Sequence, residues 1–177
     1  MNVHEAVQKR RSYRHLEKTE LTGRDLDLLI QAARLAPSCF NNQPWRYVFI
    51  TDPEKLLQMH NVYSKGNEWI HDASLVIAVF SRKEDDCIVG SREYYQFDTG
   101  LSVGQLLLQA TELGLTAHPV AGFSPKKTRE VLNIPEEYDI ITLIIVGKKA
   151  AGSPDEPSQP RKPVNEIIFQ NRFMGSN

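Results

Sequence analysis

Cysteine is scarce in this sequence, and the patterns that direct a chain to a membrane are missing. Only two cysteines, Cys39 and Cys87, occur in 177 residues, so no disulfide framework is indicated and a reducing compartment is the simpler expectation. No apolar run approaches the roughly 20 residues of a membrane-spanning helix, and the first residues lack the pattern of a signal peptide. The net charge of −1 argues against a broad basic surface. These absences predict a cytoplasmic protein with neither a nucleic-acid nor a membrane partner.

Recognisable catalytic and metal-binding motifs are missing as well. The histidines and cysteines show no spacing of metal ligands, so no metal site is predicted. There is no Gly-x-Ser-x-Gly elbow, no Gly-x-Gly-x-x-Gly after a strand and no Walker-type lysine loop. No histidine can be paired with Cys39, which is expected to be a small buried cysteine rather than a nucleophile. His118 is expected to be a hydrogen-bonded structural histidine. No catalytic side chain is predicted, and such enzymes usually rely on a cofactor.

What is present is the pattern of one globular domain over residues 1–177. Periodicity and capping signals predict helices and strands in loose alternation. The expected helices cover 2–10, Thr22 to before Pro37, 53–62, 92–113 and Ser124 to Leu132; the expected strands cover 46–51, 73–80, 115–118 and 140–146. The segments 73–80 and 140–146 are expected to be central strands, and 81–90 is expected to be a surface loop.

Two further segments suggest contact with a second copy of the chain. The helix at 92–113 is apolar around most of its circumference, and it carries the small residues Gly100, Ser102 and Gly104. These residues allow another helix to approach closely, either in a dimer or within the same chain. Residues 148–177 begin with a proline-rich polar stretch, which suits an extended arm. The apolar side chains at 167–169 then need a surface on which to bury, and a partner subunit is one candidate.

A basic hexapeptide and a polar loop are the two candidate binding segments. Residues 9–14 hold four cations, whereas the rest of the chain has 17 basic against 22 acidic residues. Arginine binds phosphate oxygens in pairs, so a phosphate monoester is a reasonable ligand, and a solvated surface is the alternative. Residues 36–45 carry five hydrogen-bonding side chains between two prolines. A stiff loop of this kind suits a flat heterocycle with donors and acceptors on its rim, and a plain helix-to-strand connection is the alternative.

Taken together, these segments resemble the FMN-dependent nitroreductase family over nearly the whole chain. The resemblance is carried by Lys9-Arg10-Arg11-Ser12-Tyr13-Arg14, by Ala36-Pro37-Ser38 with Asn41-Asn42-Gln43-Pro44-Trp45, by the helix from Asp98, and by Pro119-Val120-Ala121-Gly122-Phe123. It implies an α+β class with a three-layer fold, in which helices flank a mixed central β-sheet and a C-terminal arm extends to a partner subunit. It also implies a homodimer with FMN at the interface, NADH or NADPH as electron donor, and nitroaromatic, quinone or similar acceptors.

The resemblance also implies which residues bind the cofactor. The FMN phosphate and ribityl chain are expected at Arg10, Arg11, Ser12 and Arg14, with Arg161, or alternatively Lys162, adding to the phosphate site. The isoalloxazine ring is expected between Pro37, Ser38, Asn41 and Gln43, often supplied by the second subunit, and the strand end Pro119, Val120, Ala121 and Gly122. Arg14 is the candidate for stabilising the reduced flavin's charge near N1 and O2.

Departures from the family pattern keep other functions open. Many members have glutamate where this chain has Ala121, and an aromatic residue and a proline usually follow the glycine that is Gly147 here. The chain is short for the family, which implies an open pocket. One alternative is a flavin-binding sensor or carrier without turnover. Another is a specialised flavin-fragmenting or dehalogenating enzyme, although such enzymes usually add a substrate lid and none is obvious beyond residues 81–91.

Overall fold

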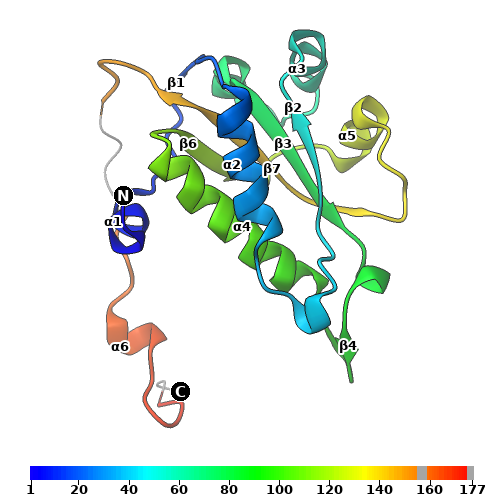
Figure 1. The fold of residues 1–177 in the computed structure, drawn as a ribbon, viewed down its shortest axis with the longest axis vertical. Helices are drawn as coiled ribbons and strands as arrows, with labels where there is room; N and C mark the ends of the chain where they lie inside the picture. Colours follow the sequence, from blue (N-terminus) through cyan, green and yellow to red (C-terminus); the bar gives the residue numbers. More distant parts are fainter. Residues whose placement is uncertain (155–158, 175–177) are drawn as a thin grey trace.

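The computed structural model describes residues 1–154 and 159–174 and has a five-stranded sheet at its centre (Figure 1). Strand β7 (Asp139–Lys149) pairs with β3 (Leu75–Ser81) and β6 (Thr116–Val120); β2 (Arg46–Ile50) pairs with β3, and β1 (Leu16–Glu17) with the end of β7. The α+β class is confirmed. The sheet differs from the expected mixed one in that all pairings of the described strands are antiparallel. Strand β2 ends where β3 begins, and β6 ends near the start of β7, so these consecutive neighbours run antiparallel.

Helices cover both faces of the sheet, which confirms the three-layer arrangement. On one face, Leu75, Ile77 and Val79 of β3 pack with α2 (Gly23–Arg34) and α4 (Tyr95–Glu112). The alternate residues Val76, Ala78 and Phe80 face the other way, toward α3 (Pro53–Met59), the 3₁₀ helix η2 (Glu68–Asp72) and α5 (Pro125–Leu132). Every residue of β3 is buried, because successive side chains of a central strand point to opposite covered faces.

Local capping signals fix most helix boundaries. Thr22 and Asp25 form a capping box at α2, and the side chains of Asp52 and Ser124 cap α3 and α5 as expected. Helix α1 (Val3–Lys9) begins in the same way at Asn2. Gly114, with φ +73°, follows the end of α4 in the left-handed conformation that favours glycine. None of the described helices is both long and apolar enough to cross a membrane.

The expected loop at 81–90 and the start of the following helix are corrected. Ser81 is fully buried as the last residue of β3, and its hydroxyl donates to the Pro44 carbonyl. A short 3₁₀ helix, η3 (Lys83–Asp85), follows, and then β4 (Ile88–Val89) and β5 (Arg92–Glu93) form a hairpin. This hairpin occupies the residues at which helix α4 was expected to begin.

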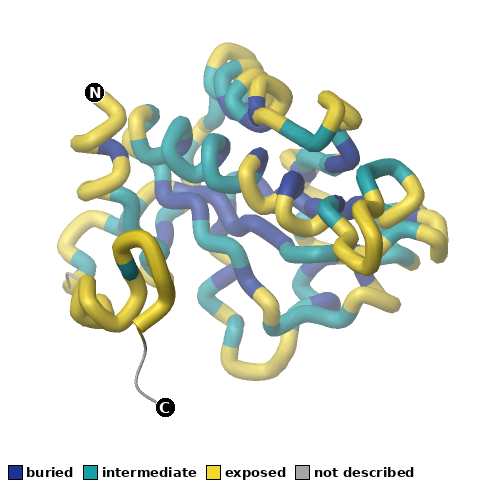
Figure 2. Tube along the Cα trace, turned by 90° about the horizontal axis from the view of Figure 1, so that it is seen from below, coloured by how far each residue is buried: buried dark blue, intermediate teal, exposed yellow. Residues whose placement is uncertain are grey.

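The C-terminal segment extends away from the body of the molecule. Lys148 and Lys149 still belong to β7, so the extension begins later than residue 148. Residues 159–174 run past α1 to the short helix α6 (Val164–Ile167), and almost all of them are exposed (Figures 1 and 2). The expected arm also includes residues 155–158 and 175–177, which lie outside the described residues. Burial of the apolar side chains at 167–169 on a partner stays a prediction.

Candidate functional site

The basic segment lies in the connection between α1 and β1. Arg10 donates to the Ser12 hydroxyl across 3.2 Å. Arg11 donates to the carbonyl oxygens of Gln8, at 2.6 Å, and of Arg10, at 2.9 Å. These contacts place the Arg11 guanidinium over the last carbonyl groups of α1, where a cation is favourable. Arg14 is exposed. Arg10 and Ser12 of the predicted cluster therefore lie together, whereas Arg11 is engaged with the helix end.

Aromatic rings connect the basic segment to the sheet. The Tyr13 carbonyl lies 3.3 Å from Nδ1 of His118, whose ring stacks on Trp69 with the centroids 4.8 Å apart. The Lys149 ammonium lies 5.0 Å from the centroid of the Tyr13 ring, in cation–π geometry. His118 thus has the expected structural role. Lys149 and Trp69 were missed as site residues, because their proximity depends on contacts between distant segments.

The strand end at 119–122 lies beside this group, directly after His118 on β6. Pro119 and Val120 are opposite Ile144 and Leu143 of β7. The Gly122 carbonyl accepts hydrogen bonds from the Ser64 N–H, at 2.9 Å, and from the Asn67 amide, at 3.3 Å. A Cβ atom at Gly122 would lie 2.8 Å from Nδ2 of Asn67, so a larger residue there would displace the Asn67 amide from its present position.

The neighbouring Tyr63 carries a buried hydroxyl. Tyr63 and Phe123 form an isolated antiparallel bridge beside Gly122. Within the described part of the chain, the Tyr63 hydroxyl has no hydrogen-bond partner, and burial raises the pKa of Tyr63. The Ala121 position, by contrast, is exposed.

The polar loop has a tightly specified and strained backbone. Phe40, Asn41 and Gln43 have φ values of 47°, 57° and 50°, in the left-handed region that non-glycine residues adopt at a cost. The Ser38 hydroxyl accepts the Gln43 N–H at 2.9 Å, and the Gln43 amide donates to the Asn41 carbonyl at 3.0 Å. Asn41 and Pro37 are exposed. Strained loops held in this way are common at ligand sites.

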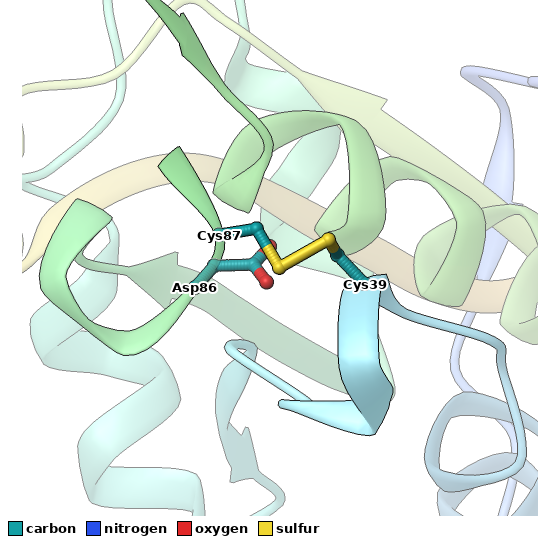
Figure 3. A group of neighbouring side chains, drawn as sticks. All are labelled: Cys39, Asp86 and Cys87. Carbon is teal, nitrogen blue, oxygen red and sulfur yellow. A yellow bond between two sulfur atoms is a disulfide. The ribbon is translucent and has the colours of Figure 1, made fainter. Parts of the chain in front are cut away.

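A disulfide joins this loop to the segment before the hairpin, which corrects the expectation for Cys39. Cys39 is half-buried and bonded to Cys87, with 6.0 Å between the Cα atoms (Figure 3). The loop with Cys39 and the segment with Cys87 meet beside the start of α4. The two cysteines are 48 residues apart in the sequence, so no local pattern predicts their contact. Cys39, Asp86 and Cys87 are close enough to resemble a three-ligand metal site, but disulfide sulfurs offer no thiolate.

Asp98 anchors the loop from the first turn of α4. Its carboxylate accepts the Cys39 N–H at 2.6 Å, and the residue is buried. Burial is the main cause that raises the pKa of Asp98; Asp86 raises it further, whereas the Cys39 N–H lowers it. Burial and the neighbouring Asp86 therefore favour the protonated form of Asp98 more than water would.

The basic segment and the polar loop do not meet within one chain. His118, beside the basic segment, is aligned with Ile145, whereas Arg46, just after the loop, is aligned through Phe80 with Ile140. Across the sheet, His118 and Arg46 are three strand spacings apart, and along the strands they are about five residues apart. Together these offsets place the two positions about 20 Å from each other. Figure 1 shows the same separation, with η1 (Cys39–Asn41) at the lower end of α4 and α1 toward the other end.

Arg161 joins neither group in the structure. It is exposed in the C-terminal segment, and within residues 1–154 and 159–174 no hydrogen bond or ion pair connects it to the basic segment. Its expected contribution to a phosphate site, and that of Lys162, remain predictions.

Known proteins share this chain's sequence and fold. A model described as the Nitroreductase family matches residues 7–65 and 57–148. The putative NAD(P)H nitroreductase MhqN of Bacillus subtilis is 26% identical, over 94% of this chain and 97% of its own. The iodotyrosine deiodinase of Thermotoga neapolitana is 27% identical, over 95% and 96%. A solved structure described as an oxidoreductase containing FMN is 26% identical, with a TM-score of 0.84 over 99% of this chain and 95% of that one.

Proposed function

Because the chain belongs to the nitroreductase family, we propose that it is an FMN-dependent oxidoreductase that uses NADH or NADPH. Its acceptors are nitroaromatics, quinones or similar small molecules. The observation that carries this proposal is the family match together with two residue groups suited to the two ends of FMN. We further propose that residues 1–177 form one FMN-binding domain and that the protein acts in the cytoplasm.

The basic segment has the donor chemistry for the FMN phosphate. Residues 9–16 contain no carboxylate, and guanidinium and hydroxyl donors gather there. Arg10, Ser12 and Arg14 would hold the phosphate and ribityl chain, whereas Arg11 supports the end of α1 on which they depend. Lys149 adds a positive charge beside Tyr13. Such charge-assisted hydrogen bonds are the strong ones available for a phosphate.

The strand end and the polar loop suit the isoalloxazine ring. The strand end at 119–122 lies beside the basic segment, and it would supply one wall of the ring site. Pro37, Ser38, Asn41 and Gln43 would supply the other wall from the partner subunit, because about 20 Å separates the loop from the basic segment within one chain. When bound, FMN would supply the hydride-transfer chemistry. The protein's role is to orient the ring, and Arg14 stabilises negative charge at its N1–O2 edge.

A homodimer through α4 is part of the same proposal. Apart from its own helix turn, an added Cβ atom at Gly100 or Gly104 would meet nothing within 4 Å, so packing against other elements of the chain does not account for these glycines. Ser102, in contrast, is explained within the chain, since its hydroxyl donates to the Ala33 carbonyl. Phe97 and Leu101 are exposed on α4. We infer that this face packs on a second copy and that the C-terminal arm covers part of it.

The similarity to an iodotyrosine deiodinase supports a second candidate, reductive dehalogenation on the same scaffold. The chain is 27% identical to that deiodinase and 26% identical to the nitroreductase relative. Sequence identity therefore does not decide between nitro or quinone acceptors and halogenated ones. A flavin-binding carrier without turnover is the third alternative, and the same experiment separates all three.

The test is the visible spectrum of the purified protein. We expect a yellow protein whose flavin absorbance bleaches when NADH or NADPH is added without oxygen and returns when an acceptor is added. Recovery with a nitroaromatic or quinone supports the leading proposal, and recovery only with iodotyrosine supports dehalogenation. Bound flavin that neither nicotinamide reduces supports a carrier. A protein that takes up no FMN contradicts all three.

A further inference from the structure

The two cysteines of the chain are paired in a disulfide. We propose that Cys39 and Cys87 form a reversible thiol–disulfide site for small dithiols, which fastens the β4–β5 hairpin onto the polar loop at 38–43. In the redox step, one dithiol gives two electrons and two protons to the Cys39–Cys87 bond. The bond becomes two thiols, and the dithiol becomes a cyclic disulfide. Both cysteines are half-buried, so a small reagent can reach them.

The hairpin has few other attachments to the body. Residues 88–93 are all exposed, and within the described part of the chain their hydrogen bonds stay inside the hairpin. At its base, the Tyr94 N–H donates to the Cys87 carbonyl at 3.1 Å. Further links are the Asn42 amide to Asp86, at 3.3 Å, and to the Cys87 sulfur, at 3.4 Å, and an ion pair between Arg46 and Asp85, at 3.3 Å. Exposed polar contacts of this kind hold a segment weakly, so the disulfide is the main fastening.

The loop depends on the same bond. Three left-handed non-glycine residues follow Cys39, and such a backbone persists only where surrounding contacts determine it. Hydrogen bonds within the loop and from the Cys39 N–H to Asp98 do so here, together with the disulfide. Reduction removes the one covalent contact among them. Both segments should then move more freely. The hairpin loses its covalent attachment, and the loop loses a contact that holds its left-handed backbone in place.

The pair would connect redox conditions to the cofactor pocket. This part rests on the proposed function, in which the loop forms one wall of the flavin site. Disulfide bonds that form in reducing compartments are usually transient, and they serve catalysis or redox sensing. With only two cysteines in the chain, no third cysteine of the same chain can exchange into the bond. The disulfide is therefore the single covalent link by which a change at the hairpin reaches the loop.

The test compares the oxidised, reduced and cysteine-free forms of the full chain. Protein isolated without reductant is denatured and treated with iodoacetamide, and its intact mass should show no label before dithiothreitol and two labels after it. Hydrogen exchange at the amides of 39–43 and 88–94 should become at least about 10-fold faster on reduction. The variant Cys39→Ser/Cys87→Ser should exchange like the reduced protein and should not respond to dithiothreitol. This variant is the control for direct effects of the reagent.

Two results would overturn the proposal. One is two labels per chain after incubation with oxidised glutathione, which would mean that the bond does not form. The other is a formed bond whose reduction leaves exchange unchanged in both segments. A chain that takes up no FMN but shows the redox-dependent exchange supports the thiol–disulfide site while contradicting the proposed flavin function.

Discussion

The backbone N–H of Cys39 donates a 2.6 Å hydrogen bond to the carboxylate of Asp98. This bond crosses 59 residues of sequence and joins a strained loop to the first turn of the longest described helix. It holds the loop at one end of α4, whereas the N-terminal ammonium of Met1 contacts Glu112 at the other end, at 3.2 Å. Helix α4 therefore separates the two candidate binding groups within a chain, and Asp98 is the fixed point of one of them.

Asp98 should make stability fall as the pH rises. Its folded pKa is raised, mainly by burial and further by Asp86, so the folded state binds this proton more tightly than the unfolded state does. The contribution is complete below the unfolded pKa of about 3.9 and is lost as the pH rises through the folded pKa. Asp98→Asn keeps an acceptor for Cys39 and should remove this loss. Urea unfolding between pH 4 and neutrality measures it, with Asp27→Asn on the exposed side of α2 as control. Parallel profiles for Asp98→Asn and wild type would contradict the assignment.

Loss of the disulfide should destabilise the protein substantially. The bond closes a loop between residues 48 apart, and the chain-entropy model assigns such a crosslink about 4 kcal/mol, with measured values usually about 2–4 kcal/mol. Cys39→Ser/Cys87→Ser should show this decrease in the free energy of unfolding relative to the oxidised wild type, by urea denaturation. The variant should match the reduced wild type. Equal stability of the oxidised and reduced wild type would show that the crosslink does not constrain the unfolded chain.

Arg14 should contribute directly to cofactor affinity. A charge-assisted hydrogen bond is worth about 1.5–3 kcal/mol, so Arg14→Ala should weaken FMN binding by roughly 10- to 100-fold and reduce its dependence on salt. Fluorescence titration with FMN measures both. Arg24→Ala removes the same charge from an exposed position of α2 and should leave affinity nearly unchanged. If the two variants bind FMN alike, the basic segment is only a solvated surface.

A large side chain on the exposed face of α4 should leave the fold of one chain intact but prevent two chains from forming the dimer. Space is open at Gly104 within the chain, so Gly104→Arg should fold, yet it places a charge where we propose that two copies meet. Sedimentation should show a monomer that has lost FMN. Gly23→Arg is the matched control, since it introduces the same side chain at another open helical glycine. A Gly104→Arg dimer with full FMN content would exclude this face as the interface.

Local features of the sequence predicted the elements well, and contacts between distant segments were harder to foresee. The caps at Thr22, Asp52 and Ser124 each act within three residues, so the sequence contains the whole signal. The contact between Tyr13 and His118 spans 105 residues, and the Cys39–Cys87 bond depends on two connections that converge over α4. Neither has a local pattern.

The candidate site shows the same division. The basic segment and the polar loop were both identifiable from residue types and from a family resemblance. The engagement of Arg11 with the end of α1 was not, because it depends on the direction in which a long flexible side chain turns. The separation of the two groups also needed the strand register, which sequence patterns alone do not provide.

The central claim is that each flavin site takes its basic segment from one chain and its polar loop from the other. Two defective chains test it: Arg10→Ala/Arg14→Ala, and Asn41→Gly/Gln43→Gly, in which glycine keeps the left-handed backbone without strain. The two are mixed under conditions that allow subunits to exchange, and bound FMN is measured per chain by absorbance. Random pairing gives half heterodimers with one intact site each, so the mixture should recover about one quarter of the wild-type FMN content. FMN content no higher than the average of the two separate variants would contradict a site shared between chains.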